Sequence, residues 1–164
     1  MNKYCLDANI LIQAWQKYYN PRFCPDYWEI LIKLGEQERI FIPKSVYEEI
    51  IRIEDDLSKW LKTSKIPIRE ENESIINCWK QILTNNPVHQ RLVDNIKGRS
   101  LADPWVIAHA LYESATVVTK EEKVTALNSP KIKIPNVCDN IGVRWINDFQ
   151  FVDEVGIRFS CYLS

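Results

Sequence analysis

The sequence predicts an α/β domain in which a central, mostly parallel sheet carries helices on both faces. Short β-branched or aromatic runs, such as residues 40–42 and 116–119, alternate along the chain with segments of helical spacing. This alternation is typical of strands that are joined by crossover helices. A chain of 164 residues is long enough for one domain with a sizeable core. We therefore expect a single domain over residues 1–164.

Composition and charge narrow the class of protein. Hydrophobic residues at 46% and charged residues at 26% fit an ordinary globular chain. No apolar run approaches the ~20 residues that span a bilayer, and the start of the chain lacks a secretory leader pattern, so we expect a cytoplasmic protein without membrane contact. The net charge of −1 means that any nucleic-acid binding must rest on local patches. Five dispersed cysteines, without a C-x-x-C pair, are expected to be small buried side chains and not a zinc site.

The chain begins with an apolar strand that ends on two polar residues. Helical spacing starts directly after this strand, in a helix expected over residues 9–19. Asp7 and Asn9 therefore lie at a strand-to-helix joint, where the carboxyl ends of parallel strands face a ligand crevice. Helix capping alone would also explain either residue.

The other elements follow from capping and periodicity. A second helix is expected to begin at Asp26, with Glu29 completing a capping box, and a further helix is expected from Ser45. Asp103 is expected to cap a helix whose first residue is Pro104 and whose sequence is apolar almost all round, so this helix should be buried. The remaining expectations are a short helix near 56–61, a break at 66–68, a helix over 75–83, a turn at 86–87, a short helix at 136–141, a strand at 143–146 and a tail around residue 156.

Acidic side chains recur at the ends of these elements: Asp7, Glu48 or Glu49, Asp103, and Glu121 or Glu122. If they converge, they form an oxygen-only cluster, which suits a hard divalent cation such as Mg²⁺ or Mn²⁺. The cation would offset the mutual repulsion of the carboxylates.

Four segments resemble, in order and rough spacing, the motif blocks of PIN-domain ribonucleases, a family that includes VapC-type toxins. They are residues 6–9, 43–50, 100–110 and 117–121. The resemblance extends from residue 4 to about 146, and Trp105 together with residues 134–138 is similar to an uncharacterised PIN-like branch. It implies a PIN-like three-layer fold and metal-dependent, endonucleolytic hydrolysis of RNA.

The resemblance also implies roles for individual residues. It places the metal-binding and catalytic acids at Asp7, Glu49, Asp103 and Glu121, with Glu122 or Asp139 as alternatives for the fourth. One or two Mg²⁺ or Mn²⁺ ions would activate a water molecule, and the products would carry a 5′-phosphate and a 3′-hydroxyl. Asn9 and Thr119 are expected to orient a ligand or water, although helix capping and strand-end hydrogen bonding explain them equally well.

Contacts with RNA are expected from basic and aromatic residues near these acids, namely Lys97, Arg99, Lys120, Lys123, Tyr18 and Tyr19. His109 is expected to be a hydrogen-bonded core histidine, and His89 has no evident partner. If the resemblance extends to biology, the chain is the toxin of a type II toxin–antitoxin pair that a small antitoxin protein silences, and a homodimer is possible.

Two other classes of protein remain open at this point. One is a non-catalytic PIN-like interaction module whose acids only cap helices. The other is a metal-dependent phosphatase of the haloacid-dehalogenase type, which needs a second aspartate two residues after the first, where this chain has Asn9.

Overall fold

Five parallel strands form one sheet within residues 1–94 and 102–164, which the computed structural model describes. The strand order is β3-β2-β1-β4-β5, and each neighbouring pair is parallel. The strands are β1 (Tyr4–Leu6), β2 (Ile40–Pro43), β3 (Ile68–Arg69), β4 (Thr116–Val118) and β5 (Trp145–Ile146). Because all strands run the same way, their carboxyl ends share one edge of the sheet.

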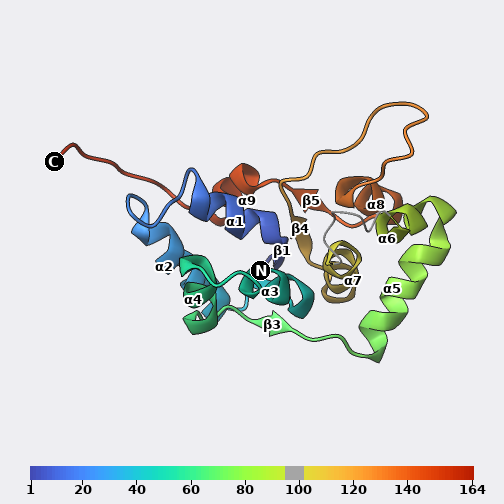
Figure 1. Ribbon diagram of the computed structural model, residues 1–164, viewed down its shortest axis with the longest axis horizontal. Helices are drawn as coiled ribbons and strands as arrows, with labels where there is room; N and C mark the ends of the chain where they lie inside the picture. The colour runs from blue at the N-terminus through green and yellow to red at the C-terminus, as the bar shows by residue number, and fades with distance from the viewer. Residues whose placement is uncertain (95–101) are drawn as a thin grey trace.

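Helices cover both faces of this sheet (Figure 1). They are α1 (Ala8–Gln16), α2 (Pro25–Glu36), α3 (Lys44–Ile51), α4 (Asp56–Thr63), α5 (Glu73–Asn85), α6 (Arg91–Asp94), α7 (Asp103–Glu113), α8 (Ile134–Ile141) and α9 (Asp148–Val155), with a 3₁₀ turn η1 (Pro87–Gln90). Helix α1 packs on α3 and α3 on α4, whereas α7 packs on α5 and α8. The predicted three-layer α/β fold with a parallel sheet is confirmed.

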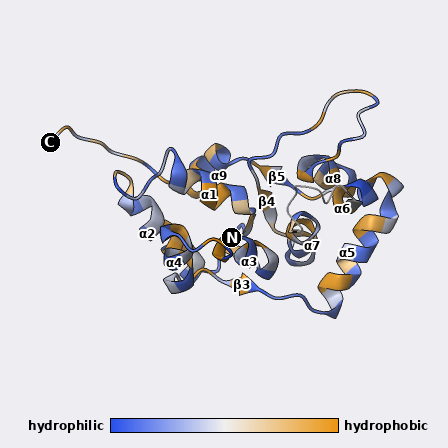
Figure 2. Ribbon diagram, in the orientation of Figure 1, coloured by the Kyte–Doolittle hydropathy of each residue, from blue (hydrophilic) through white to orange (hydrophobic). Residues whose placement is uncertain are grey.

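The core lies between the sheet and these helices. Strands β1, β2 and β4 are buried along their whole length. Figure 2 shows hydrophobic and hydrophilic residues alternating along helices such as α5. Helix α7 is buried on nearly all sides, as its apolar sequence predicts. None of the described helices combines the length and apolar character needed to cross a membrane.

Three helix ends differ from the prediction. Helix α1 ends at Gln16 and not at Tyr19, because the Asn20 side-chain amide donates to the carbonyl of Trp15 (2.9 Å) and closes the chain into a turn. Asp26 is not a cap, since α2 already begins at Pro25, whose fixed φ suits a first helical position. Asp103 is likewise the first residue of α7, and Ala102 occupies the cap position before it.

Strand β3 and helix α9 were not predicted. Strand β3 begins at the last residue of the expected break at 66–68 and pairs with β2 through Ile42 and Ile68. Helix α9 replaces the expected tail. Its start is a capping box, in which the backbone N–H of Gln150 donates to Asn147 Oδ1 (2.8 Å) and the backbone N–H of Asn147 donates to Gln150 Oε1 (2.9 Å). The spacing Asn-x-x-Gln was the local signal for this helix.

Candidate metal centre

The polar residues at the ends of β1 and β4 meet at the carboxyl edge of the sheet. Strand pairing continues past β1, where the backbone N–H of Asp7 donates to the carbonyl of Val118 (3.0 Å). The Thr119 hydroxyl then donates to Asp7 Oδ2 (2.8 Å). Both side chains are buried, and Asp7 is only 3% exposed. Two adjacent strand ends are thus joined through a carboxylate that has little access to water.

The pKa of Asp7 is raised to about 7, and burial is the largest cause. The negative charges of Glu121 and Glu49 also raise this pKa, and hydrogen bonds from the Thr119 hydroxyl and the backbone N–H of Ala8 partly offset the rise. The bond from Ala8 (2.8 Å) is also the N-cap of α1, so the capping role considered for Asp7 is real. This hydrogen bond alone does not offset the negative charges of Glu121 and Glu49, which also act on the Asp7 carboxylate.

Helix α3 presents its two adjacent glutamates differently. Glu48 is exposed and Glu49 is half-buried, and it is the charge of Glu49 that acts on Asp7. Neighbouring residues on a helix are rotated by roughly 100°, so only one of the two can face the sheet edge.

Among the three alternatives for the fourth acid, Glu121 is the one whose charge acts on Asp7. Its backbone N–H donates to Thr119 Oγ1 (3.1 Å), and its Oε2 accepts the backbone N–H of Ile134 (2.9 Å), the first residue of α8. Glu122 is exposed. Asp139 is bound to the Lys123 ammonium (2.7 Å) and to the Trp145 indole N–H (2.8 Å), and these bonds hold its pKa below the usual range.

Asp103 is placed at the same edge by the direction of α7. Only two residues separate the end of α7 from β4, and α7 packs on β4, so the helix runs antiparallel to the strands and begins at their carboxyl ends. The Cys5 thiol donates to the carbonyl of Val106 (3.6 Å), which holds the first turn of α7 beside β1. Asp103 is 4% exposed there.

The donor set at this edge fits a hard cation chemically. It consists of carboxylates, and each oxygen of Asp7 accepts one hydrogen bond and keeps a further lone pair. As the side chains stand, no three His, Cys, Asp or Glu residues of the described chain are grouped closely enough to hold a metal ion. Ion binding would therefore require side-chain rotation of the glutamates toward Asp7.

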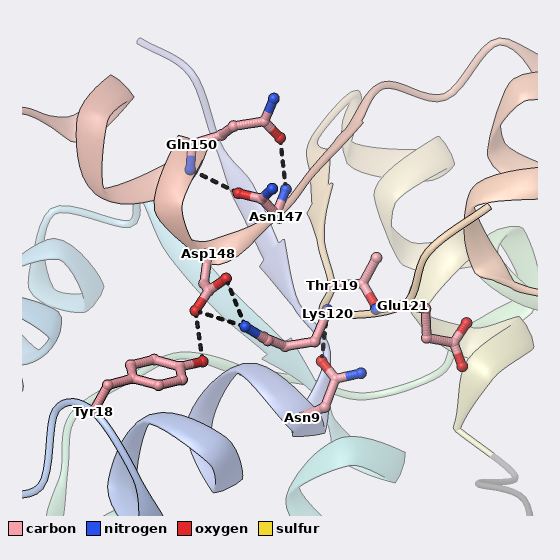
Figure 3. A network of polar contacts seen from close by, with 8 residues as sticks. All are labelled: Asn9, Tyr18, Thr119, Lys120, Glu121, Asn147, Asp148 and Gln150. Carbon is pink, nitrogen blue, oxygen red and sulfur yellow. Dashed lines mark hydrogen bonds and ion pairs between the residues drawn. The ribbon is translucent and has the colours of Figure 1, made fainter.

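Beside these acids lies a second polar network, which centres on Lys120 (Figure 3). Its ammonium contacts Asp148 Oδ1 (3.2 Å), and the Tyr18 hydroxyl donates to Asp148 Oδ2 (2.6 Å). The ammonium also lies 4.9 Å from the ring centres of Tyr18 and Phe149. The backbone N–H of Lys120 donates to Asn9 Oδ1 (3.0 Å), so Asn9 ties the end of β4 to α1.

The residues that were expected to contact RNA differ in their environments. Lys120 is held internally by Asp148, and Lys123 is paired with Asp139. Tyr18 and Tyr19 are half-buried and packed edge to face on each other. Lys97 and Arg99 lie outside the described residues.

Asp148 is the residue of this network that the sequence did not reveal. It is 1% exposed and neutralises Lys120, whose side chain is itself largely buried. Removing one partner of a buried ion pair leaves an uncompensated charge. We expect Asp148→Ala to lower the free energy of unfolding by about 3 kcal/mol in urea titrations. The matched control is Asp153→Ala, which removes an exposed pair with Arg158 and should change stability little; equal losses in both variants would contradict a structural role for Asp148.

The two histidines differ from their expected environments. His109 is buried in α7, but neither ring nitrogen has a partner within the described part of the chain, and burial lowers its pKa. His89, expected without a partner, has two: its Nδ1 lies 2.7 Å from the Ile82 carbonyl and its Nε2 lies 3.0 Å from Asn140 Nδ2. A carbonyl oxygen can only accept, so His89 Nδ1 donates to Ile82, and the second contact ties the ring to α8.

Comparison with solved structures places this architecture among PIN-like domains. The chain aligns with a chain of VapBC2 from Rickettsia felis, solved bound to a DNA fragment from its promoter (TM-score 0.56, 19% identity, 88% of this chain and 97% of that chain). It aligns equally with FitAB bound to an IR36 DNA fragment (TM-score 0.56, 16% identity, 89% and 95%). FitAcB from Neisseria gonorrhoeae gives a TM-score of 0.56 at 16% identity, with 89% and 98% covered.

At these identities the similarity establishes the fold, and it confirms at that level the PIN-domain resemblance of the four motif segments. Within this class, a family model described as "Domain of unknown function (DUF4411)" matches residues 4–159, and the chain belongs to that family. No curated protein sequence matches the chain significantly.

Proposed function

We propose that this protein is a metal-dependent endoribonuclease of the PIN type that hydrolyses phosphodiester bonds of RNA in the cytoplasm. The observation that carries the proposal is the buried Asp7 carboxylate, whose pKa of about 7 reflects burial and the converging charges of Glu49 and Glu121. A buried acid that is opposed by two others is unfavourable unless a cation compensates it. The PIN-like fold supports the same assignment.

Four acids would hold Mg²⁺ or Mn²⁺, namely Asp7, Glu49, Asp103 and Glu121. Such an ion, when bound, lowers the pKa of a coordinated water and neutralises phosphate charge. Thr119 fixes one Asp7 oxygen and the backbone of Glu121, so the two acids keep a constant relation. The Asn9 side chain accepts the backbone N–H of Lys120, the residue between Thr119 and Glu121 in the sequence. Hydrolysis by water attack would leave a 5′-phosphate and a 3′-hydroxyl.

We also propose that the chain is the toxin of a toxin–antitoxin pair and that a small antitoxin protein holds it inactive. The fold shared with chains of the VapBC2 and FitAB complexes supports this proposal. Antitoxin binding would need to cover the carboxyl edge of the sheet, since that is where the acids lie.

Metal binding can be tested with a matched pair of variants on one helix. We expect titration calorimetry to detect Mn²⁺ binding to the wild type, and Glu49→Gln to weaken it by at least about 10-fold. Glu48→Gln, one residue away and exposed, should leave the affinity unchanged. Negligible heats for all three proteins would favour the non-catalytic interaction module instead.

A further inference from the structure

A pocket of about 350 Å³ opens beside the candidate metal centre. It lies between the residues that follow β4 and the first turn of α9, and its walls include Lys120, Glu121, Lys123, Trp145, Phe149 and Gln150. This volume falls within the range of roughly 300–1,000 Å³ that is usual for small-ligand sites. Since Glu121 is one of its walls, whatever occupies the pocket lies next to the proposed catalytic acids.

Phe149 is the exposed aromatic residue of this pocket. Phe149 lies in the first turn of α9 and is 56% exposed. The ring is fixed in direction by Tyr18, whose ring centre is 5.7 Å away, and by the Lys120 ammonium, 4.9 Å from its own centre. Lys120 is in turn anchored on buried Asp148. The Lys120 ammonium lies over the ring, and more than half of the Phe149 surface stays exposed to water.

Amide groups accompany this ring. The capping box of α9 occupies the side-chain oxygens of Asn147 and Gln150, and both residues line the pocket (Figure 3). Within the described chain, their NH₂ groups stay available as donors. A planar ligand with acceptor atoms on its edge matches an aromatic platform bordered by such donors.

We propose that this pocket is a nucleobase subsite, in which an unpaired base of the RNA stacks on Phe149. The proposal rests on the proposed function, because that function supplies RNA as the ligand. Unpaired bases are commonly bound by stacking on aromatic side chains and by hydrogen bonds to their edges. The subsite adjoins Glu121, so it would hold a nucleotide close to the bond that is cleaved and fix the register of the strand.

The first test is RNA binding without cleavage. A fluorescein-labelled single-stranded RNA is titrated in EDTA and followed by anisotropy. Loss of one stacked base weakens binding by roughly 5- to 150-fold, and we expect this loss for Phe149→Ala and for Phe149→Leu, which keeps an apolar side chain but no ring. Phe149→Tyr should bind like the wild type. Phe23→Ala is the control, because Phe23 is 64% exposed and lines a different pocket.

The second test needs no variant. An RNA that carries 2-aminopurine in place of one base is bound by the wild type, and transfer of that base from its neighbours onto Phe149 should change its fluorescence at one position of the strand. Fluorescence that is the same in free and bound RNA at every position overturns the subsite. Equal RNA affinity of the wild type and Phe149→Leu also overturns the subsite and leaves the nuclease proposal standing. A wild type that binds no RNA in EDTA overturns the subsite, and cleavage of the same RNA in Mn²⁺ decides the nuclease proposal separately.

Discussion

Asp103→Asn is expected to lower the rate of RNA cleavage by at least about 100-fold while the fold stays intact. Loss of a group that merely supports a metal ligand already costs 10- to 100-fold, so loss of a ligand's charge should cost more. Asparagine has the same shape as aspartate, so the substitution keeps the packing of the buried first residue of α7. The measurement is cleavage of end-labelled structured RNA in Mn²⁺, with analysis of the product ends.

The matched control for this experiment is Asp153→Asn, which makes the same change at an exposed carboxylate of α9. It should cleave at the wild-type rate. A second readout is growth: expression of the wild type should arrest cells, and expression of Asp103→Asn should not. Unchanged turnover in Asp103→Asn would refute the assignment of the acids, and the non-catalytic alternative would then be the better account of the fold.

Asp7→Asn is expected to make the metal-free protein less sensitive to alkaline conditions. The pKa of Asp7 is about 7 in the folded chain, against 3.8 for the unpaired group, so the folded state binds more protons between these values. Stability therefore falls as pH rises through this window, because ionising the carboxylate in the folded chain is costly. Between pH 5 and pH 8 the wild type should lose about 2–3 kcal/mol relative to Asp7→Asn.

The measurement is urea unfolding in EDTA at both pH values, followed by tryptophan fluorescence. The control variant is Asp26→Asn, which replaces an exposed carboxylate and should follow the wild type at both pH values. Added Mn²⁺ should stabilise the wild type at pH 8 more than it stabilises Asp7→Asn, since a bound cation favours the ionised acid. Parallel pH profiles for the wild type and Asp7→Asn would contradict the raised pKa.

The layered fold was predictable because its signals are local. A short apolar run predicted β1, β-branched and aromatic runs predicted β2 and β4, and the apolar sequence after Asp103 predicted a buried helix. Strand β3 was not predictable in this way: it has only two residues, one of them Ile68, and forms because the edge of β2 is available for pairing. Helix α9 was also not predicted, because its capping pattern is a weak signal by itself.

The position of Asp7 at the edge of the sheet was predictable from the sequence, and the contacts around it were not. The helical periodicity that starts after the first strand placed Asp7 at the edge of the sheet. In the structure, the charges of Glu49 and Glu121 act on it. The partner of Lys120 is 28 residues further along the chain, and no spacing rule connects such a pair. A basic residue beside an acidic site therefore looked like a surface contact, whereas its charge is neutralised internally.

One carboxylate at the edge of the sheet has a partner on each side. Glu121 acts electrostatically on Asp7, and through Oε2 it holds the backbone N–H at the start of α8, so it closes the loop of residues 122–133. Any rearrangement that draws this side chain toward Asp7 must weaken or replace its hold on Ile134. Under the proposed function, metal binding at the acidic edge would therefore be thermodynamically linked to the order of this loop, and each would shift the other by the same free energy.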